Sequence, residues 1–291
     1  MGIGILTDST ADLPDNLYKK LDIEVIPLTV NFGEDTFIDG QEINSEEFFQ
    51  KISQYNQQPT TSMPSVGNFL ERYKKLNKKY DQIISIHLSG NLSGTLNSAR
   101  LAAKEISGIE VFPVDSKSIS LGLGFQVLYA ARLIKAGKNI PEIKEKLAQA
   151  RNNLLLYFTV NDLTYMKEGG RIGKAQAFLG SILNINPIIS ISTETGEVEP
   201  LDKMRGKTRT LKKMINIAEG RLSETDTAWI GFAHGNRKKD MLKFKNKLLD
   251  EINSEFKINP EIFETRISPT LGSHVGPSVY AGFIMTDIDL S

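Results

Sequence analysis

Short apolar runs alternate with amphipathic stretches along the first half of the chain, and this alternation constrains the fold most strongly. The apolar runs are rich in β-branched residues and are expected to be strands: 3–7, 23–30, 83–88 and 110–114. The stretches between them open with residues that cap helices: Asp12, Asn44 and Ser65. Strands that alternate with helices favour βα units around a largely parallel sheet.

After a further expected strand near 155–160 the sequence pattern changes to segments interrupted by glycine and to basic stretches that are expected to be helices. The runs 188–192 and 198–204, separated by a turn that contains Gly196, predict an antiparallel hairpin. We therefore expect an α/β protein with two domains, residues 1–158 and 159–291. A chain of 291 residues is long enough for both.

Composition excludes several classes of function. Lys plus Arg and Asp plus Glu both number 35, so the net charge is zero and general nucleic-acid binding is not expected. The chain has no cysteine, which excludes disulfides, thiolate catalysis and Cys-ligated metals. With neither a signal-peptide pattern nor an apolar run long enough to span a bilayer, a cytoplasmic location is expected.

Two hydroxyl-rich segments, 60–65 and 89–95, each lie where a helix is expected to begin. A helix start leaves backbone N–H groups without partners, so clustered hydroxyls there can bind an anion. Helix capping alone explains either segment, and only their pairing favours a ligand site. Segment 89–95 carries no lysine or arginine, which favours a carboxylate over a triphosphate. It has neither the Walker nor the dinucleotide-binding pattern.

Other polar residues have ordinary structural explanations that compete with functional ones. Asp8 and Asp12 are expected to tie a turn rather than bind metal, and His87 is expected to be a satisfied core residue. His274 lies between glycines that allow a ligand close to the backbone. Ser93, His274 and Asp115 could form a hydrolytic triad, although the nucleophile-elbow pattern is absent.

Several motifs, taken in order, resemble the DegV family, whose characterised members are the fatty-acid-binding subunits (FakB) of bacterial fatty acid kinase. They are Asp8-Ser9-Thr10, Thr61-Ser62-Met63-Pro64-Ser65, Leu92-Ser93-Gly94-Thr95, Val114-Asp115-Ser116, Gly169-Gly170-Arg171-Ile172, Lys203-Met204-Arg205 and His274-Val275-Gly276-Pro277. The resemblance covers essentially the whole chain. It departs from the family at Met63, where Gln is frequent, and at Ser278, where Gly is frequent.

The resemblance implies a Rossmann-like N-terminal parallel sheet, a mixed α/β C-terminal domain, and a long-chain fatty acid between them. It places the fatty acid carboxylate at the following residues: Thr61, Ser62, Ser93, Gly94, Thr95, His274 and Gly276. It assigns Arg171, Arg205 and His274 to interaction with a separate ATP-dependent kinase subunit, which phosphorylates the carboxylate for phospholipid synthesis. This chain would then have no catalytic residue, metal or cofactor of its own. Transient contact with a membrane is compatible with this function.

The acyl tail needs an apolar lining, and candidate residues exist. They are the run 177–183 together with Leu121, Phe125, Phe283 and Ile284, although an ordinary core would have the same composition. Two rival functions remain at this level. One is a hydrolase or phosphotransferase that acts on a small carboxylate with Ser93 and His274, and the other is a sensor for which the lipid is only a signal.

Overall fold

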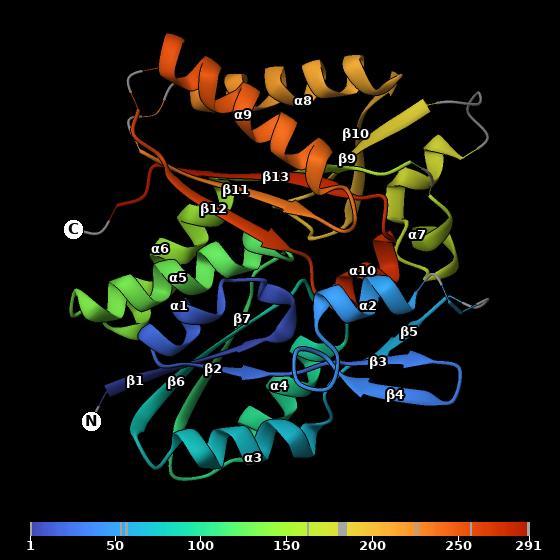
Figure 1. The fold of residues 1–291 in the computed structure, drawn as a ribbon. Coiled ribbons are helices and arrows are strands. Elements are labelled where there is room, and N and C mark those ends of the chain that lie inside the picture. The colour runs from blue at the N-terminus through green and yellow to red at the C-terminus, as the bar shows by residue number, and fades with distance from the viewer. Residues whose placement is uncertain are drawn as a thin grey trace.

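The computed structural model has five layers, in which helices and sheets alternate (Figure 1). It describes residues 2–52, 54–55, 58–161, 163–179, 185–223, 225, 227–256 and 258–289. No described helix is both long enough and apolar enough to cross a membrane. The mixed α/β class expected from the sequence is confirmed, with one parallel sheet and one mixed sheet.

The first sheet has four parallel strands in the order β2-β1-β6-β7. Their bounds are β2 (Ile23–Ile26), β1 (Gly2–Asp8), β6 (Tyr80–His87) and β7 (Glu110–Asp115). Helices α3 (Val66–Leu76) and α4 (Thr95–Glu105) cover its outer face (Figure 1). The strand order reverses between β1 and β6, and the carboxyl ends of these strands are the usual ligand position in such sheets.

Helix α5 (Leu121–Lys135) lies between the two main sheets and packs against both. Twelve of its 15 residues are buried, as expected for a helix that is apolar on all sides. The sequence pattern predicts a helix over 126–136, whereas α5 begins five residues earlier. A methyl group on Gly124 would lie 2.5 Å from the carbonyl oxygen of Ala11, so glycine permits this close packing. Helix α6 (Ile140–Asn152) packs beside it, and the short α1 (Asp15–Lys20) follows β1.

The second sheet has six strands in the order β10-β9-β8-β13-β11-β12. Their bounds are β10 (Val198–Arg205), β9 (Ile185–Ile191), β8 (Leu154–Thr159), β13 (Tyr280–Thr286), β11 (Ala228–His234) and β12 (Glu261–Arg266). Only β11 and β12 pair in parallel, and the predicted β9–β10 hairpin is present. Helices α8 (Lys207–Leu222) and α9 (Lys238–Glu255) cover the outer face (Figure 1).

A small antiparallel sheet, β4-β3-β5, corrects one expectation and adds a strand to another segment. The predicted strand 23–30 is two strands, because the chain leaves the first sheet after β2, passes Pro27, and enters β3 (Thr29–Phe32). The first hydroxyl segment, 60–65, does end at a helix start, because Ser65 caps α3 as expected. Its first three residues form a strand that was not expected, β5 (Thr60–Ser62), which pairs with β3, while β4 (Asp35–Ile38) pairs on the other side. Helix α3 begins only at Val66, after a capping box of Ser65 and Asn68.

Three short helices join the sheets: α2 (Ser45–Lys51), α7 (Thr164–Glu168) and α10 (Pro269–Val275). The predicted Asn44–Glu47 capping box at α2 is present. Asp12 does not cap α1, whose first flanking residue is Pro14. Its carboxylate instead bonds to Ser120 and Ser268, because these distant donors compete successfully for it. Two 3₁₀ helices complete the part of the chain that the structure describes, Ser9–Ala11 and Gly173–Phe178.

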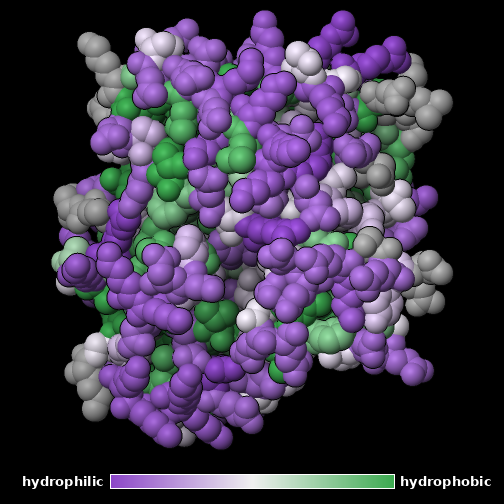
Figure 2. All heavy atoms as spheres, viewed as in Figure 1, coloured by the Kyte–Doolittle hydropathy of each residue, from purple (hydrophilic) through white to green (hydrophobic). Residues whose placement is uncertain are grey.

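The division at 158/159 stays a prediction. It falls near the end of β8, which belongs to the second sheet, and one continuous apolar cluster includes residues from both sheets and α5. On the face seen in Figure 2, hydrophilic residues predominate and hydrophobic ones appear only in small patches.

Candidate functional site

A buried polar network holds the carboxyl ends of β1 and β6. The Asp8 carboxylate accepts hydrogen bonds from the backbone N–H of Thr10 and Leu88, at 3.1 and 2.9 Å, and from the Thr10 hydroxyl. His87 Nδ1 lies 3.0 Å from Asp8, and its Nε2 lies 2.7 Å from the Ser85 hydroxyl. The sequence-based interpretation of Asp8 and His87 as structural residues is therefore confirmed. The network fixes the point at which β6 enters the second hydroxyl segment.

This second segment lies immediately before α4, as the sequence predicts. The Ser93 hydroxyl is 2.9 Å from the buried Thr95 hydroxyl, and Gly94 is the residue that precedes the helix. The turn between β9 and β10 lies against the same segment: the Ser89 hydroxyl donates to the Gly196 carbonyl at 2.8 Å. The loop belongs to the first half of the chain, and the β9–β10 turn of the second half packs against it.

The first hydroxyl segment places Thr61 and Ser62 on opposite faces of β5. The Thr61 hydroxyl is 2.9 Å from Nε2 of His274. Ser62 and Thr60 instead face the amide of Asn31, each at 3.4 Å. Side chains alternate along a strand, so the structure brings Thr61 to the site and turns Ser62 away from it.

His274 lies on α10 with a neutral imidazole. Burial, followed by the positive charge of Arg171, lowers its pKa to about 4. Within the described part of the chain, its buried Nδ1 has no hydrogen-bond partner. Gly169 packs against this nitrogen, and a methyl group there would lie 2.7 Å from it.

Arg171 brings a cation to the second hydroxyl segment, where it contacts Leu92, 79 positions away in the sequence. Its Nε donates to the Leu92 carbonyl at 3.2 Å, and its Nη1 donates to the Gly169 carbonyl at 2.7 Å. Segment 89–95 itself carries no lysine or arginine, as the sequence shows, but the fold adds this cation from a distant part of the chain. A guanidinium group next to hydroxyls favours an anion still more strongly.

These groups converge on a narrow apolar cavity between the sheets. Ten of its fifteen lining residues are apolar: Leu28, Leu88, Leu92, Ile119, Phe158, Met166, Ile191, Val198, Leu271 and Val275. The polar lining residues are Thr61, Ser93, Arg171, Thr270 and His274, with no carboxylate among them. About 50 Å³ is open to the centre of a water-sized sphere, so the cavity is a narrow slot.

Other predicted residues lie elsewhere. Arg205 is exposed at the end of β10 and does not line the cavity. Gly276 ends α10 with a positive φ of 72°, and a methyl group there would lie 2.6 Å from the Tyr165 ring, so its role here is local packing. Met63 packs closely over Gly94, although half of its surface is exposed.

The predicted tail-binding residues do not line this cavity either. Leu121, Phe125, Phe283 and Ile284 are fully buried in the two apolar cores, as their composition equally allowed. Of the run 177–183, residues 180–183 lie outside the described residues. The residues that do line the cavity are scattered along the chain from Leu28 to Val275, so no single apolar run in the sequence predicts them.

Sequence reasoning also missed Gln58. Its amide donates to the carbonyls of Tyr165 and Ser273, at 2.8 and 3.1 Å, and so ties the start of β5 to α7 and α10. A lone glutamine in a polar stretch carries no signal of such a role.

The hydrolytic triad is not assembled. Ser93 is bonded to Thr95, His274 to Thr61, and the Asp115 carboxylate accepts from the backbone of Gly90 and Lys117. Ser85, His87 and Asp8 are bonded in the order of a triad, but all three are fully buried and none lines the cavity. No group of three or more His, Asp or Glu side chains could hold a metal among the described residues.

Known proteins are similar to this chain in sequence and in fold. Residues 2–287 match the family model described as "Uncharacterised protein, DegV family". The protein DegV of Bacillus subtilis (strain 168) is 33% identical over 277 residues, which cover 95% of this chain and 96% of that protein. A DegV domain-containing protein of Clostridium acetobutylicum is 35% identical over 279 residues, covering 95% and 96%.

Solved structures agree with the fold. A DegV family protein from Thermus thermophilus, described as fatty-acid-binding, superposes with a TM-score of 0.92 at 32% identity, covering 99% of this chain and 100% of that one. DegV from Bacillus subtilis, described as a fatty acid binding protein, gives 0.90 at 31% identity with the same coverage. The chain therefore belongs to the DegV family.

Proposed function

We propose that this protein binds a long-chain fatty acid, with the tail in the apolar cavity and the carboxylate at Thr61, Ser93, His274 and Arg171. The observation that carries the proposal is the composition of the cavity: an apolar slot whose polar groups are hydroxyls, one imidazole and one guanidinium, with no acid among them. The fatty acid binding described for the Thermus thermophilus and Bacillus subtilis relatives supports it.

Energetics favour such a ligand. Burial of a methylene contributes about 0.8 kcal/mol, so a tail of about 14 methylenes contributes about 11 kcal/mol before the costs of ordering. A buried carboxylate needs several donors to replace its hydration, and hydroxyls with a guanidinium provide them. Because the slot is narrow, the lining side chains move apart as the tail enters.

The neutral imidazole of His274 suits this role. With its pKa lowered to about 4, it is uncharged at neutral pH; when its Nε2–H donates to the Thr61 hydroxyl, that hydroxyl keeps its own proton for a bound carboxylate. Because this pKa lies well below neutral pH, the imidazole carries no positive charge there. Arg171 therefore supplies the positive charge at the site.

The finer part of the proposal is that the protein presents the carboxylate to a separate ATP-dependent kinase subunit, which forms the acyl phosphate. Its support is the resemblance to the FakB subunits, together with exposed Arg205, which is left outside the cavity and available to a partner. We assign no catalytic residue to this chain, because Ser93 and His274 are not paired with each other.

Binding is tested with delipidated protein and oleate or palmitate, followed by mass spectrometry of the retained lipid. We expect one fatty acid per chain, and Ser93→Ala should weaken binding by about 1–3 kcal/mol, since a buried carboxylate loses a donor. Absence of retained lipid in the wild type would overturn the proposal. Hydrolysis of acyl esters or phosphates by the protein alone would favour the enzymatic alternative.

A further inference from the structure

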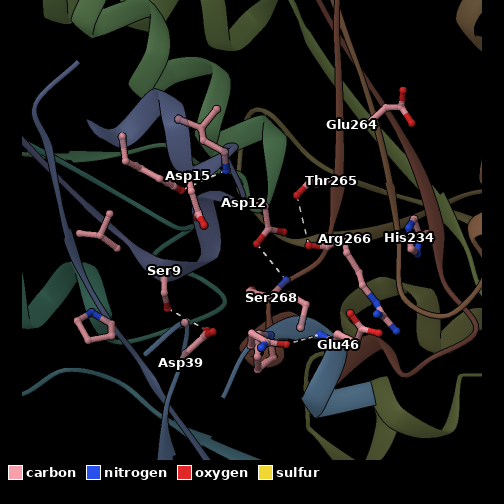
Figure 3. Close-up of a pocket in the computed structure, with 18 of the residues that line it drawn as sticks. Ser9, Asp12, Asp15, Asp39, Glu46, His234, Glu264, Thr265, Arg266 and Ser268 are labelled. Atoms are coloured by element: carbon pink, nitrogen blue, oxygen red, sulfur yellow. Dashed lines mark hydrogen bonds between the residues drawn. The ribbon is translucent and has the colours of Figure 1, made fainter. Parts of the chain in front are cut away.

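A large polar cleft lies outside the apolar cavity, and among the described residues none lines both. By the same measure as the cavity, the cleft holds about 890 Å³. Figure 3 shows Ser9 and Asp39 on one side of it, and His234 and Glu264 on the other. The proposed function gives this cleft no role.

Strands from both main sheets end at the cleft. Strands β1 and β2 pair in parallel in the first sheet, and β11 and β12 pair in parallel in the second. The residues at or just after their carboxyl ends line the cleft: Ser9, Pro27, His234 and Arg266. The carboxyl ends of parallel strands are the usual ligand position in α/β proteins. The cleft therefore lies where the topology favours a binding site.

His234 presents a free acceptor to the cleft. The residue is only 8% exposed. Its Nδ1 lies 2.7 Å from the carbonyl oxygen of Gly235, which can only accept, so Nδ1 carries the ring hydrogen. Burial lowers the pKa of His234, so the ring is neutral at neutral pH and Nε2 keeps its lone pair. Within the described part of the chain, no group donates to Nε2.

Asp39 presents a second free acceptor, from the other side of the cleft. It is only 3% exposed. Its Oδ2 accepts from the Ser9 hydroxyl at 2.9 Å, and from both the backbone N–H and the hydroxyl of Thr270. Its Oδ1 receives no hydrogen bond from any residue that the structure describes. A buried carboxylate oxygen without a donor is costly, so a ligand that donates to it is favoured.

Carboxyl groups outnumber bases in the lining. The acids are Asp12, Asp15, Asp39, Glu46 and Glu264, and the bases besides the neutral His234 are Lys238 and Arg266. Arg266 already donates to the Gly235 carbonyl and to the Asn236 side chain, and Glu264 is paired with Lys245. Burial raises the pKa of Asp12 to about 8 and that of Asp39 to about 6, so at neutral pH Asp12 is mostly neutral and Asp39 is mostly ionised. Three carboxylates then face two cations, which favours a positively charged ligand.

We propose that this cleft binds an aliphatic diamine or polyamine, whose ammonium groups donate to Asp39 Oδ1 on one wall and to His234 Nε2 on the other. An ammonium group has three donors and no acceptor, which suits two buried acceptors that lack donors. Because the two acceptors lie on opposite sides, a ligand with two ammonium groups contacts both, whereas a monoamine contacts one. The inference goes beyond fatty acid binding and does not depend on it.

The first test is calorimetric titration of the whole chain, without added fatty acid, with spermidine as the probe. Salt at about 0.15 M screens exposed charges, so weak attraction to the surface does not mimic the site. Propylamine, sorbitol and inorganic phosphate are the comparison ligands: a monoamine, a neutral polyol and an anion.

We expect one spermidine per chain, bound at least about tenfold more tightly than propylamine. Equal affinities for spermidine and propylamine would overturn the two-sided contact. Tighter binding of sorbitol or phosphate than of spermidine would overturn the assignment to an amine, and so would spermidine binding that does not saturate.

The second test removes the charge of Asp39 with Asp39→Asn, which keeps the size of the side chain. Asp250→Asn is the matched control, since Asp250 is an exposed acid on α9 that does not line the cleft. We expect Asp39→Asn to weaken spermidine binding at least about tenfold and Asp250→Asn to keep the wild-type affinity. Equal affinities for the two variants would overturn the site.

If circular dichroism shows that Asp39→Asn does not fold, the double variant Asp15→Asn/Glu46→Gln replaces it. Both residues line the cleft and are exposed, so the fold should tolerate the change. We expect spermidine binding at least about fivefold weaker, and wild-type affinity would overturn the proposal. Failure to bind spermidine leaves the fatty acid proposal standing, because retained lipid is measured separately.

Discussion

Thr61→Val is the sharpest test of the head-group assignment, because it changes one hydroxyl and little else. Valine keeps the shape and β-branching of threonine, so β5 should still pair with β3. The hydroxyl that it removes is the one 2.9 Å from His274 Nε2, on the wall of the cavity.

The magnitude follows from the burial of the partners. A buried carboxylate that loses one hydroxyl donor costs about 1–3 kcal/mol of binding, which corresponds to about a 5- to 150-fold increase in Kd. The free protein loses the Thr61–His274 hydrogen bond, which contributes about 1 kcal/mol, and gains strand propensity from valine. Binding should therefore change more than the free energy of unfolding.

The assay is displacement of a fluorescent fatty acid, with urea unfolding measured on the same samples. Thr60→Val is the matched control, since Thr60 belongs to the same strand but faces Asn31 on its opposite side. Ser62→Ala provides a second control and should retain wild-type affinity, because Ser62 also faces Asn31. Equal affinities for Thr61→Val and Thr60→Val would refute the assignment of Thr61 to the carboxylate.

Three further outcomes are expected. Gly169→Ala should weaken lipid binding at least about fivefold and cost about 1–3 kcal/mol of stability, because its methyl group would lie 2.7 Å from His274 Nδ1. Gly220→Ala is the control, because a methyl group there would meet open space. Equal urea midpoints and equal affinities for the two variants would contradict the contact. Arg205→Ala should keep the lipid but reduce acyl phosphate formation by an added kinase subunit, and loss of lipid would place Arg205 in the binding site. The free energy of unfolding should fall as pH rises, because burial raises the pKa of Asp39 to about 6 and that of Asp12 to about 8. The stabilisation that comes from these raised pKa values is complete below the ordinary pKa of 3.8, and it is lost as the pH rises through about 6 and about 8. Urea unfolding from pH 5 to 9 checks this, and no difference in slope between wild type and Asp12→Asn would contradict it.

Local sequence patterns predicted most of the strands and helices. The β1, β6 and β7 strands were predicted from short β-branched runs, and α2 from its capping residues, because these signals act over a few neighbouring residues. The start of α5 was predicted too late. Its first turn contains two glycines, and their use in close packing against Ala11 and Ser118 depends on distant parts of the chain.

Within the site, the sequence by itself determined which chemical groups were available: hydroxyls at Thr61 and Ser93, a histidine between glycines, and a family resemblance that placed a carboxylate among them. Only the tertiary structure decided which of these meet. It turned Ser62 away by strand alternation and brought Arg171 to Leu92.

The cavity and the buried acids belong to the tertiary structure for the same reason. Leu28, Ile119 and Leu271 are unremarkable in sequence and line one cavity only because three sheets and α10 converge. Asp12 carries the signal of a helix cap, yet it bonds to Ser120 and Ser268. A local pattern records what a side chain can do with its neighbours in sequence, whereas packing decides which neighbours it has in space.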